Sequence, residues 1–154
     1  MYEFAYLGIA YLFAVAWPLA VIDIRERRLP NRLVLPAIPI AIAGQVVAAI
    51  SGAPWWPMLY AIGAGLAAFG LGLIANLRGG LGMGDVKLIA AMSLSLGWFS
   101  PLAPLLGVSL AFVSAGFWLG IKLVAKKASM GSNIALGPYL LVGFVLASIN
   151  QVLS

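Results

Sequence analysis

The chain has 154 residues, of which 64% are hydrophobic and only 8% are charged. Soluble globular domains carry about 25% charged residues, so this composition excludes an ordinary soluble fold and indicates a membrane protein. The formal net charge is +5, but the basic residues lie between apolar runs and are not spread over a surface, so we predict no nucleic-acid partner. We expect a single membrane-embedded domain over residues 1–154, with the lipid bilayer as its surroundings.

Four runs without any charged residue predict the membrane-spanning helices. A helix needs about 20 apolar residues to cross a bilayer, so the two longest runs each allow two crossings. The predicted fold class is therefore all-α, a polytopic bundle of six transmembrane helices. The uncharged runs cover residues 4–22, 33–77, 88–121 and 128–154. The expected spans, in chain order, are 4–23, 33–51, 57–77, 84–99, 101–122 and 133–153.

Two turns divide the long apolar runs. Residues 51–57 combine glycine and proline with two tryptophans, whose indoles are typical of a membrane interface. Residues 98–101, ending in Ser-Pro, predict the second turn. Both turns lie in segments without charge, which matters for the orientation of the bundle.

All nine basic residues fall in the first, third and fifth loops between the expected spans. Cytoplasmic loops of membrane proteins are enriched in Lys and Arg, so this distribution predicts cytoplasmic basic loops and both termini outside the cytoplasm. The basic residues are Arg25, Arg27, Arg28 and Arg32 in the first loop, Arg78 and Lys87 around the third, and Lys122, Lys126 and Lys127 in the fifth.

The sequence contains no cysteine and no histidine. This excludes disulfides, thiolate or histidine metal sites, cysteine nucleophiles and a serine-histidine triad. Acid-base chemistry must then come from Asp, Glu, Lys or Tyr. We expect neither a metal site nor a cofactor.

Two of the four acidic residues lie at the predicted cytoplasmic membrane edge. Asp23 ends the first span and Asp85 begins the fourth, whereas Glu3 is near the N-terminus and Glu26 lies among arginines. An ionisable group beside the hydrocarbon is costly unless it is paired, hydrated or lining a cavity, so both aspartates are candidates for function.

Each aspartate also has a purely structural interpretation. Asp85 is placed to cap the N-terminus of the fourth span, and Asp23 could pair with Arg27 at helical i, i+4 spacing. Residues 79–84 include four glycines, which would let a peptide approach Asp85 closely or would form a hinge. These alternatives stay open from the residues alone.

A pair of carboxyl groups can hydrolyse a peptide bond without a metal. Two like charges at close range favour a state in which one group is protonated and the other ionised. The ionised carboxylate removes a proton from water, and the neutral one donates a hydrogen bond to the scissile carbonyl.

Three segments together resemble one known family. Residues 82–88, GMGDVKL, resemble the GxGD motif of type IV prepilin peptidases. Residues 23–31, DIRERRLPN, resemble the segment that carries the family's other catalytic aspartate and its "IPN" loop. Residues 135–140, ALGPYL, are similar to the "PFGP" segment before the last helix, with Ala and Leu in place of Pro and Phe.

The resemblance implies an aspartic endopeptidase of the bacterial inner membrane that removes the short basic leader of prepilins or pseudopilins at the cytoplasmic face. Asp23 and Asp85 would be its catalytic residues. The residues expected to bind substrate or shape the site are Gly82, Gly84, Lys87, Pro30, Asn31, Gly137 and Pro138.

Short members of this kind resemble those that serve tight-adherence pili. Larger members have an N-terminal cytoplasmic region with paired cysteines and methyltransferase activity, so here we expect peptidase activity alone. Two alternatives share the aspartates: a protease of the presenilin or signal-peptide-peptidase kind, and a small proton-coupled transporter. A transporter would be expected to carry acids near the bilayer midplane or internal repeats with broken helices.

Two further patterns concern helix packing and the glycine loop. Gly116 and Gly120 form GxxxG, and small residues recur at 63–68, for which close packing within the bundle is expected over dimerisation. Asn76 lies one turn before the glycine loop, where it would cap the third span or bind a substrate backbone; we favour the cap.

Overall fold

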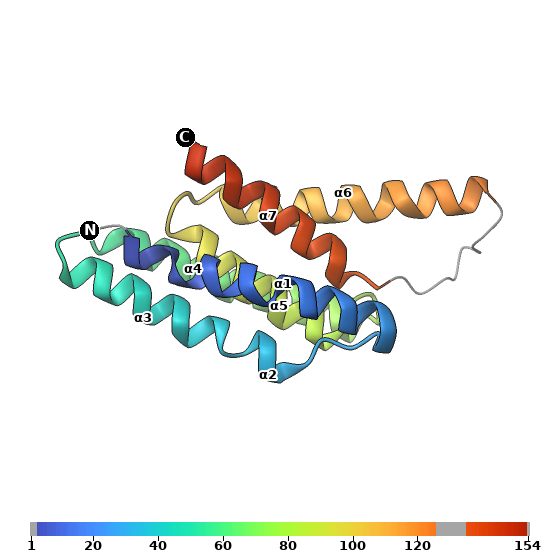
Figure 1. The fold of residues 1–154 in the computed structure, drawn as a ribbon, viewed down its shortest axis with the longest axis horizontal. Coiled ribbons are helices and arrows are strands. Elements are labelled where there is room, and N and C mark those ends of the chain that lie inside the picture. The colour runs from blue at the N-terminus through green and yellow to red at the C-terminus, as the bar shows by residue number, and fades with distance from the viewer. Residues whose placement is uncertain (1–2, 126–134, 154) are drawn as a thin grey trace.

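In a computed structural model, which describes residues 3–125 and 135–153, the chain folds into a bundle of helices (Figure 1). The described part contains no strand, which confirms the predicted all-α class. The elements are η1 Glu3–Tyr6, α1 Leu7–Glu26, α2 Asn31–Val34, α3 Ala37–Ile50, α4 Trp56–Leu77, α5 Met83–Gly97, α6 Ala103–Val124 and α7 Gly137–Leu153.

Four of the six expected spans are long and apolar enough to cross a membrane. These are Glu3–Glu26, Asn31–Ile50, Trp56–Leu77 and Ala103–Val124. The other two expected spans form helices of only 15 residues in α5 and 17 residues in α7. At 1.5 Å per residue α5 rises about 22 Å, less than the hydrocarbon thickness. The expected start of the last span, at 133, lies outside the described residues.

The second expected span differs from the prediction because it is divided near its start. α2 and α3 are separated by Leu35 and Pro36. A proline has no N–H for the helical ladder and its ring crowds the preceding turn, which accounts for the break. α2 therefore forms a separate short helix after the loop at residues 27–30.

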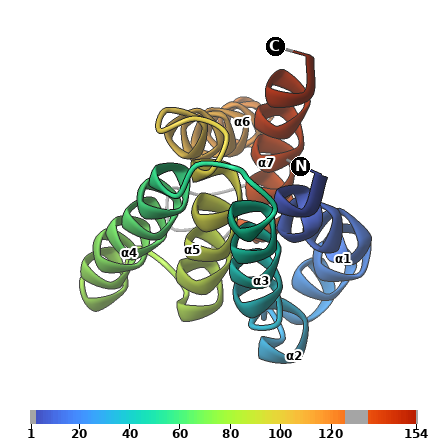
Figure 2. The same cartoon turned by 90° about the vertical axis from the view of Figure 1, so that its left-hand side faces the viewer.

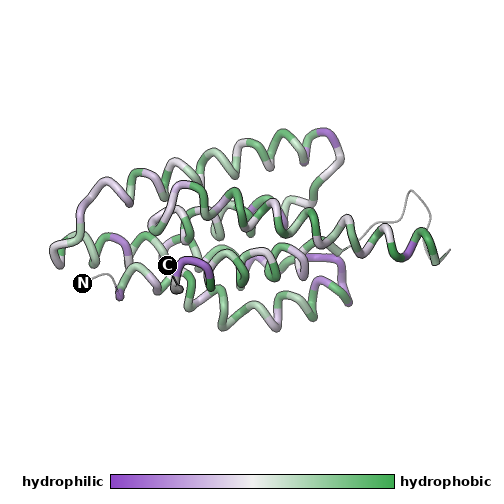
Figure 3. The backbone as a smooth tube through the Cα atoms, turned by 90° about the horizontal axis from the view of Figure 1, so that it is seen from above, coloured by the Kyte–Doolittle hydropathy of each residue, from purple (hydrophilic) through white to green (hydrophobic). Residues whose placement is uncertain are grey.

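α5 is the centre of the bundle. It packs closely on α4 and also contacts α1, α3, α6 and α7. Eleven of its fifteen residues are buried, among them Leu88, Met92 and Leu96. Because α5 is surrounded by protein, it has no need of the length that a lipid-facing span requires. Figure 3 shows that the surrounding helices are apolar along most of their length.

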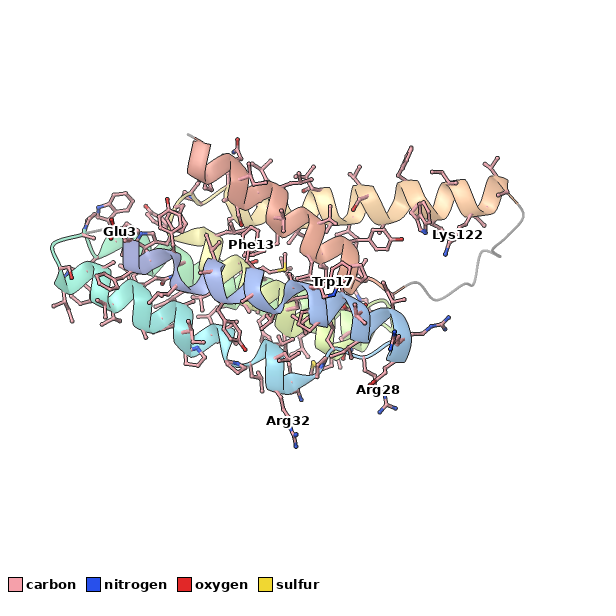
Figure 4. All side chains as sticks on the ribbon, in the orientation of Figure 1. Glu3, Phe13, Trp17, Arg28, Arg32 and Lys122 are labelled. Atoms are coloured by element: carbon pink, nitrogen blue, oxygen red, sulfur yellow. The ribbon has the colours of Figure 1, made fainter. Side chains whose placement is uncertain are left out.

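The basic loops and the termini lie at opposite ends of the bundle. In Figure 1 both termini and the turns after α3 and α5 are at one end, and the loops after α1 and α4 are at the other. Figure 4 shows Arg28 and Lys122 toward that second end and Glu3 at the first. The first and third basic loops thus lie at the end of the bundle opposite the chain ends; Lys126 and Lys127 of the fifth loop lie outside the described residues, and the placement of the termini outside the cytoplasm stays a prediction.

Small residues form the close contact between α6 and α7, but the GxxxG motif at Gly116 and Gly120 does not lie at that contact. A Cβ on Gly143 of α7 would meet backbone atoms of Gly107 and Ala111 of α6. On Gly116 or Gly120, by contrast, it would meet nothing within 4 Å in the described residues. The expectation that this motif packs within the bundle is wrong, because α6 extends past its neighbours there (Figure 1).

The α6–α7 contact predicts a difference between two glycine substitutions. Gly143→Ala places a methyl group against the α6 backbone, which cannot move as a side chain can, so we expect a loss of about 1–3 kcal/mol of unfolding free energy. Gly116→Ala, in open space, is the control and should be neutral or slightly stabilising. Unfolding by SDS titration in mixed micelles measures both, and equal stabilities would contradict the packing described.

Candidate active site

Asp23 lies in the last turn of α1 and is held by the start of another helix. Its side chain is 5% exposed, and its Oδ2 accepts a hydrogen bond of 2.9 Å from the backbone N–H of Gly137. Gly137 is the first residue of α7, where the free N–H groups of a helix favour a negative charge. α1 thus supplies the carboxylate, and α7 supplies the donor that fixes it.

Asp85 lies at the start of a helix as well. It is the third residue of α5, after Gly82 at the N-cap position, and its Oδ2 lies next to the Gly82 backbone. The side chain is partly buried. Among the described residues no side chain caps the start of α5, so the alternative in which Asp85 serves only as the cap is wrong, and its carboxylate faces a cavity that Asp23 shares.

The two carboxylates line the same two cavities, of about 360 and 540 Å³, and are close enough to repel each other. The smaller cavity is lined by Asp23, Arg27, Arg28, Leu29, Asn31, Gly82, Met83, Gly84, Asp85 and Lys87. The larger one is lined by Asp23, Arg27, Gly79, Gly80, Leu81, Gly82, Asp85, Phe112, Ala135 and Leu136. The structure thus brings together residues that are 62 positions apart in the sequence.

The glycines of the site allow one loop to lie between two helix starts. A Cβ on Gly84 would be 2.9 Å from the Cβ of Leu29. On Gly137 it would be 2.6 Å from Oδ2 of Asp23 and 3.2 Å from Leu29. Gly84 thus leaves room for the loop at residues 27–30, whereas Gly79, Gly80 and Gly82 line the larger cavity; the expected approach of a peptide at this loop, or its use as a hinge, stays a prediction.

Three other residues expected at the site, Lys87, Pro30 and Pro138, lie on different helices around it. Lys87 Nζ donates a 3.0 Å hydrogen bond to Oδ1 of Asn31, which ties α5 to the start of α2. Pro30 is the N-cap residue of α2, and its carbonyl accepts hydrogen bonds from the N–H groups of Leu33 and Val34. Pro138 is the second residue of α7, as expected for a proline at a helix start, but it is not part of the lining of either cavity.

The expectation that Asp23 and Arg27 lie on one face of a helix is wrong. α1 ends at Glu26, and Arg27 adopts a left-handed backbone with φ of 51°. The side chain of Arg27 therefore leaves the helical face on which an i, i+4 pair would form. It lines both cavities instead and contributes a positive charge beside the carboxylates.

Asn76, for which we favoured a cap of the third span, donates a 2.7 Å hydrogen bond from Nδ2 to the Leu81 carbonyl and so supports the glycine loop. Leu29 and Phe112 were not predicted at the site, because the sequence does not distinguish one apolar residue from another in an apolar chain. Arg27 and Arg28 were interpreted as determinants of orientation, and Arg27 also as a partner of Asp23, but neither as part of the cavity lining.

Comparison with known proteins adds one finding to this geometry. Residues 10–150 match the type IV leader peptidase family, which covers α1 to α7 and both aspartates. No curated protein and no solved structure matched the chain. Since the match extends over nearly all of the sequence, the chain belongs to the type IV leader peptidase family.

Proposed function

We propose that this protein is an aspartic endopeptidase that removes the short basic leader from prepilin-type proteins at the cytoplasmic face of the inner membrane, with Asp23 and Asp85 as the catalytic pair. The family supports a leader peptidase, and the residues of the site give it a mechanism. The observation that carries the proposal is that both carboxylates line the same two cavities.

The chemistry follows from two carboxyl groups that share one proton. The ionised group takes a proton from water as the water oxygen attacks the scissile carbonyl carbon, and the neutral group donates a hydrogen bond to the carbonyl oxygen. The C–N bond then breaks as a carboxyl group returns a proton to the leaving nitrogen. The hydrogen bond from Gly137 holds Asp23 in position during these steps, and the first turn of α5 positions Asp85.

The depth of the site favours cleavage at the membrane face over cleavage inside a membrane helix. Both aspartates lie at helix ends, at the same end of the bundle as Arg27 and Arg28. A protease that cuts within a membrane helix, or a carrier that moves protons through the bilayer, would more naturally hold its acids deeper.

Replacement of either aspartate by asparagine tests the catalytic pair. Asp23→Asn and Asp85→Asn keep the size of the side chain but remove the acid, so each should lower leader cleavage by at least about 100-fold. The measurement is the gel shift of a prepilin incubated with membranes that contain each variant. Glu26→Gln, an exposed acid in the same turn of α1, is the matched control and should cleave normally. Full processing by either aspartate variant would contradict the mechanism.

The glycine beside Asp23 predicts a loss of activity without loss of the acid. Gly137→Ala places a methyl group where Oδ2 of Asp23 now lies, so the carboxylate must shift and cleavage should fall on the order of 10- to 100-fold. The control is Gly116→Ala in α6, whose Cβ would meet nothing within 4 Å in the described residues and which lines neither cavity. Initial rates of prepilin cleavage at equal protein amounts compare the two; equal rates would refute the positioning role of Gly137.

The orientation of the bundle can be tested with single cysteines, because the chain has none of its own. Ser51→Cys and Arg25→Cys both replace exposed residues, one in the turn after α3 and one at the end of α1. A membrane-impermeant maleimide should label position 51 in intact spheroplasts, and position 25 only after the membrane is opened. The reverse pattern would place the aspartates on the outer side.

A further inference from the structure

A third cavity, of about 380 Å³, lies between α4 and α6 above α5. α4 and α6 are separate at this place, with α5 beside α4, as Figure 2 shows. No charged residue lines this cavity, which is bounded mainly by alanine, leucine and proline side chains. We call it the α4–α6 groove, with Ala64, Ala68 and Ala75 of α4 on one side and Leu105 and Val108 of α6 on the other.

The wall formed by α4 has little side-chain bulk. Ala64, Ala68, Gly72 and Ala75 recur at intervals of three or four residues and line the groove along one face of the helix. From the first to the last of them α4 rises about 16 Å, or three helical turns. Small residues of this kind let the backbone of a second helix approach closely in a membrane.

The groove opens into the catalytic site. Leu81 and Phe112 line both the groove and the larger of the two cavities that contain Asp23 and Asp85. The backbone of Leu81 is fixed at this junction by its hydrogen bond from Asn76. An apolar segment in the groove would therefore lead directly to the two carboxylates.

The floor of the groove contains one polar side chain, that of Ser93 in α5, which is 2% exposed and lines the groove. Its hydroxyl group can both donate and accept a hydrogen bond, in a lining that is otherwise apolar.

We propose that the α4–α6 groove holds an apolar helical segment of the substrate, on the C-terminal side of the scissile bond. The leader itself is basic and does not suit a groove whose lining has no charged residue, so the segment in the groove is the one that follows the leader. This inference rests on the proposed function. It places the scissile bond at Leu81 and Phe112, where groove and catalytic cavity meet.

Filling the groove should impair binding while the catalytic pair stays intact. Ala67 is exposed and lines the groove, whereas its neighbour Leu66 is 68% exposed and does not. We expect Ala67→Trp to lower kcat/KM at least tenfold, mainly through a higher KM, and Leu66→Trp to stay within twofold of the wild type. The substrate is a test protein whose basic leader precedes an apolar helix of about 20 residues, in proteoliposomes.

Cross-linking gives a second measurement that needs no bulky substitution. The photo-reactive residue p-benzoylphenylalanine replaces Leu71, which lines the groove, or Leu66, as the control. Adducts with the apolar segment of the substrate should form from position 71 and not from 66. Lipid adducts alone at position 71, or equal kinetics of Ala67→Trp and Leu66→Trp, would overturn the groove assignment while leader cleavage stands. If the wild type does not cleave the leader, the proposed function itself fails and the groove proposal falls with it.

Discussion

The structure depends on holding two carboxylates together beside the hydrocarbon of a membrane. Burial and mutual repulsion both oppose this arrangement, and isolated charges there would cost several kcal/mol. The compensation comes from helix starts, since the carboxylate of Asp23 accepts the N–H of Gly137 in α7 and that of Asp85 lies in the first turn of α5. The positions of three helix ends are thereby coupled to the position of the acids.

This coupling explains why two positions beside the site, 84 and 137, have no room for a residue larger than glycine. Leu29 lies between Gly84 and Gly137, and a methyl group on either glycine would displace it or Asp23. The hydrogen bond from Lys87 to Asn31 fixes the same loop from its other side. Segments near residues 29, 84 and 137 thus meet in one small volume, and the short, buried α5 acts as the common support.

The sequence was sufficient for the class of fold, because uncharged runs and clustered basic residues directly reflect the cost of charge in a bilayer. It also singled out Asp23 and Asp85 as candidates, since few ionisable groups exist, and the structure places both in the lining of the same cavities; their catalytic role stays a prediction. It did not predict the break at Pro36 or the open face of Gly116, which depend on how neighbouring helices cover each other. The roles of Leu29 and Phe112 were equally hidden, because apolar side chains acquire a place only through three-dimensional contacts.

The most direct test concerns the proximity of the two acids in the resting protein. The double variant Asp23→Cys/Asp85→Cys, in a chain without other cysteines, can be treated in membranes with a short bifunctional thiol reagent. The pair Asn31→Cys/Lys87→Cys, whose native side chains are 3.0 Å apart, serves as the positive control. We expect both pairs to cross-link, as seen by intact mass and by loss of maleimide labelling. Free thiols at 23 and 85 beside a cross-linked control would contradict the paired-carboxylate site.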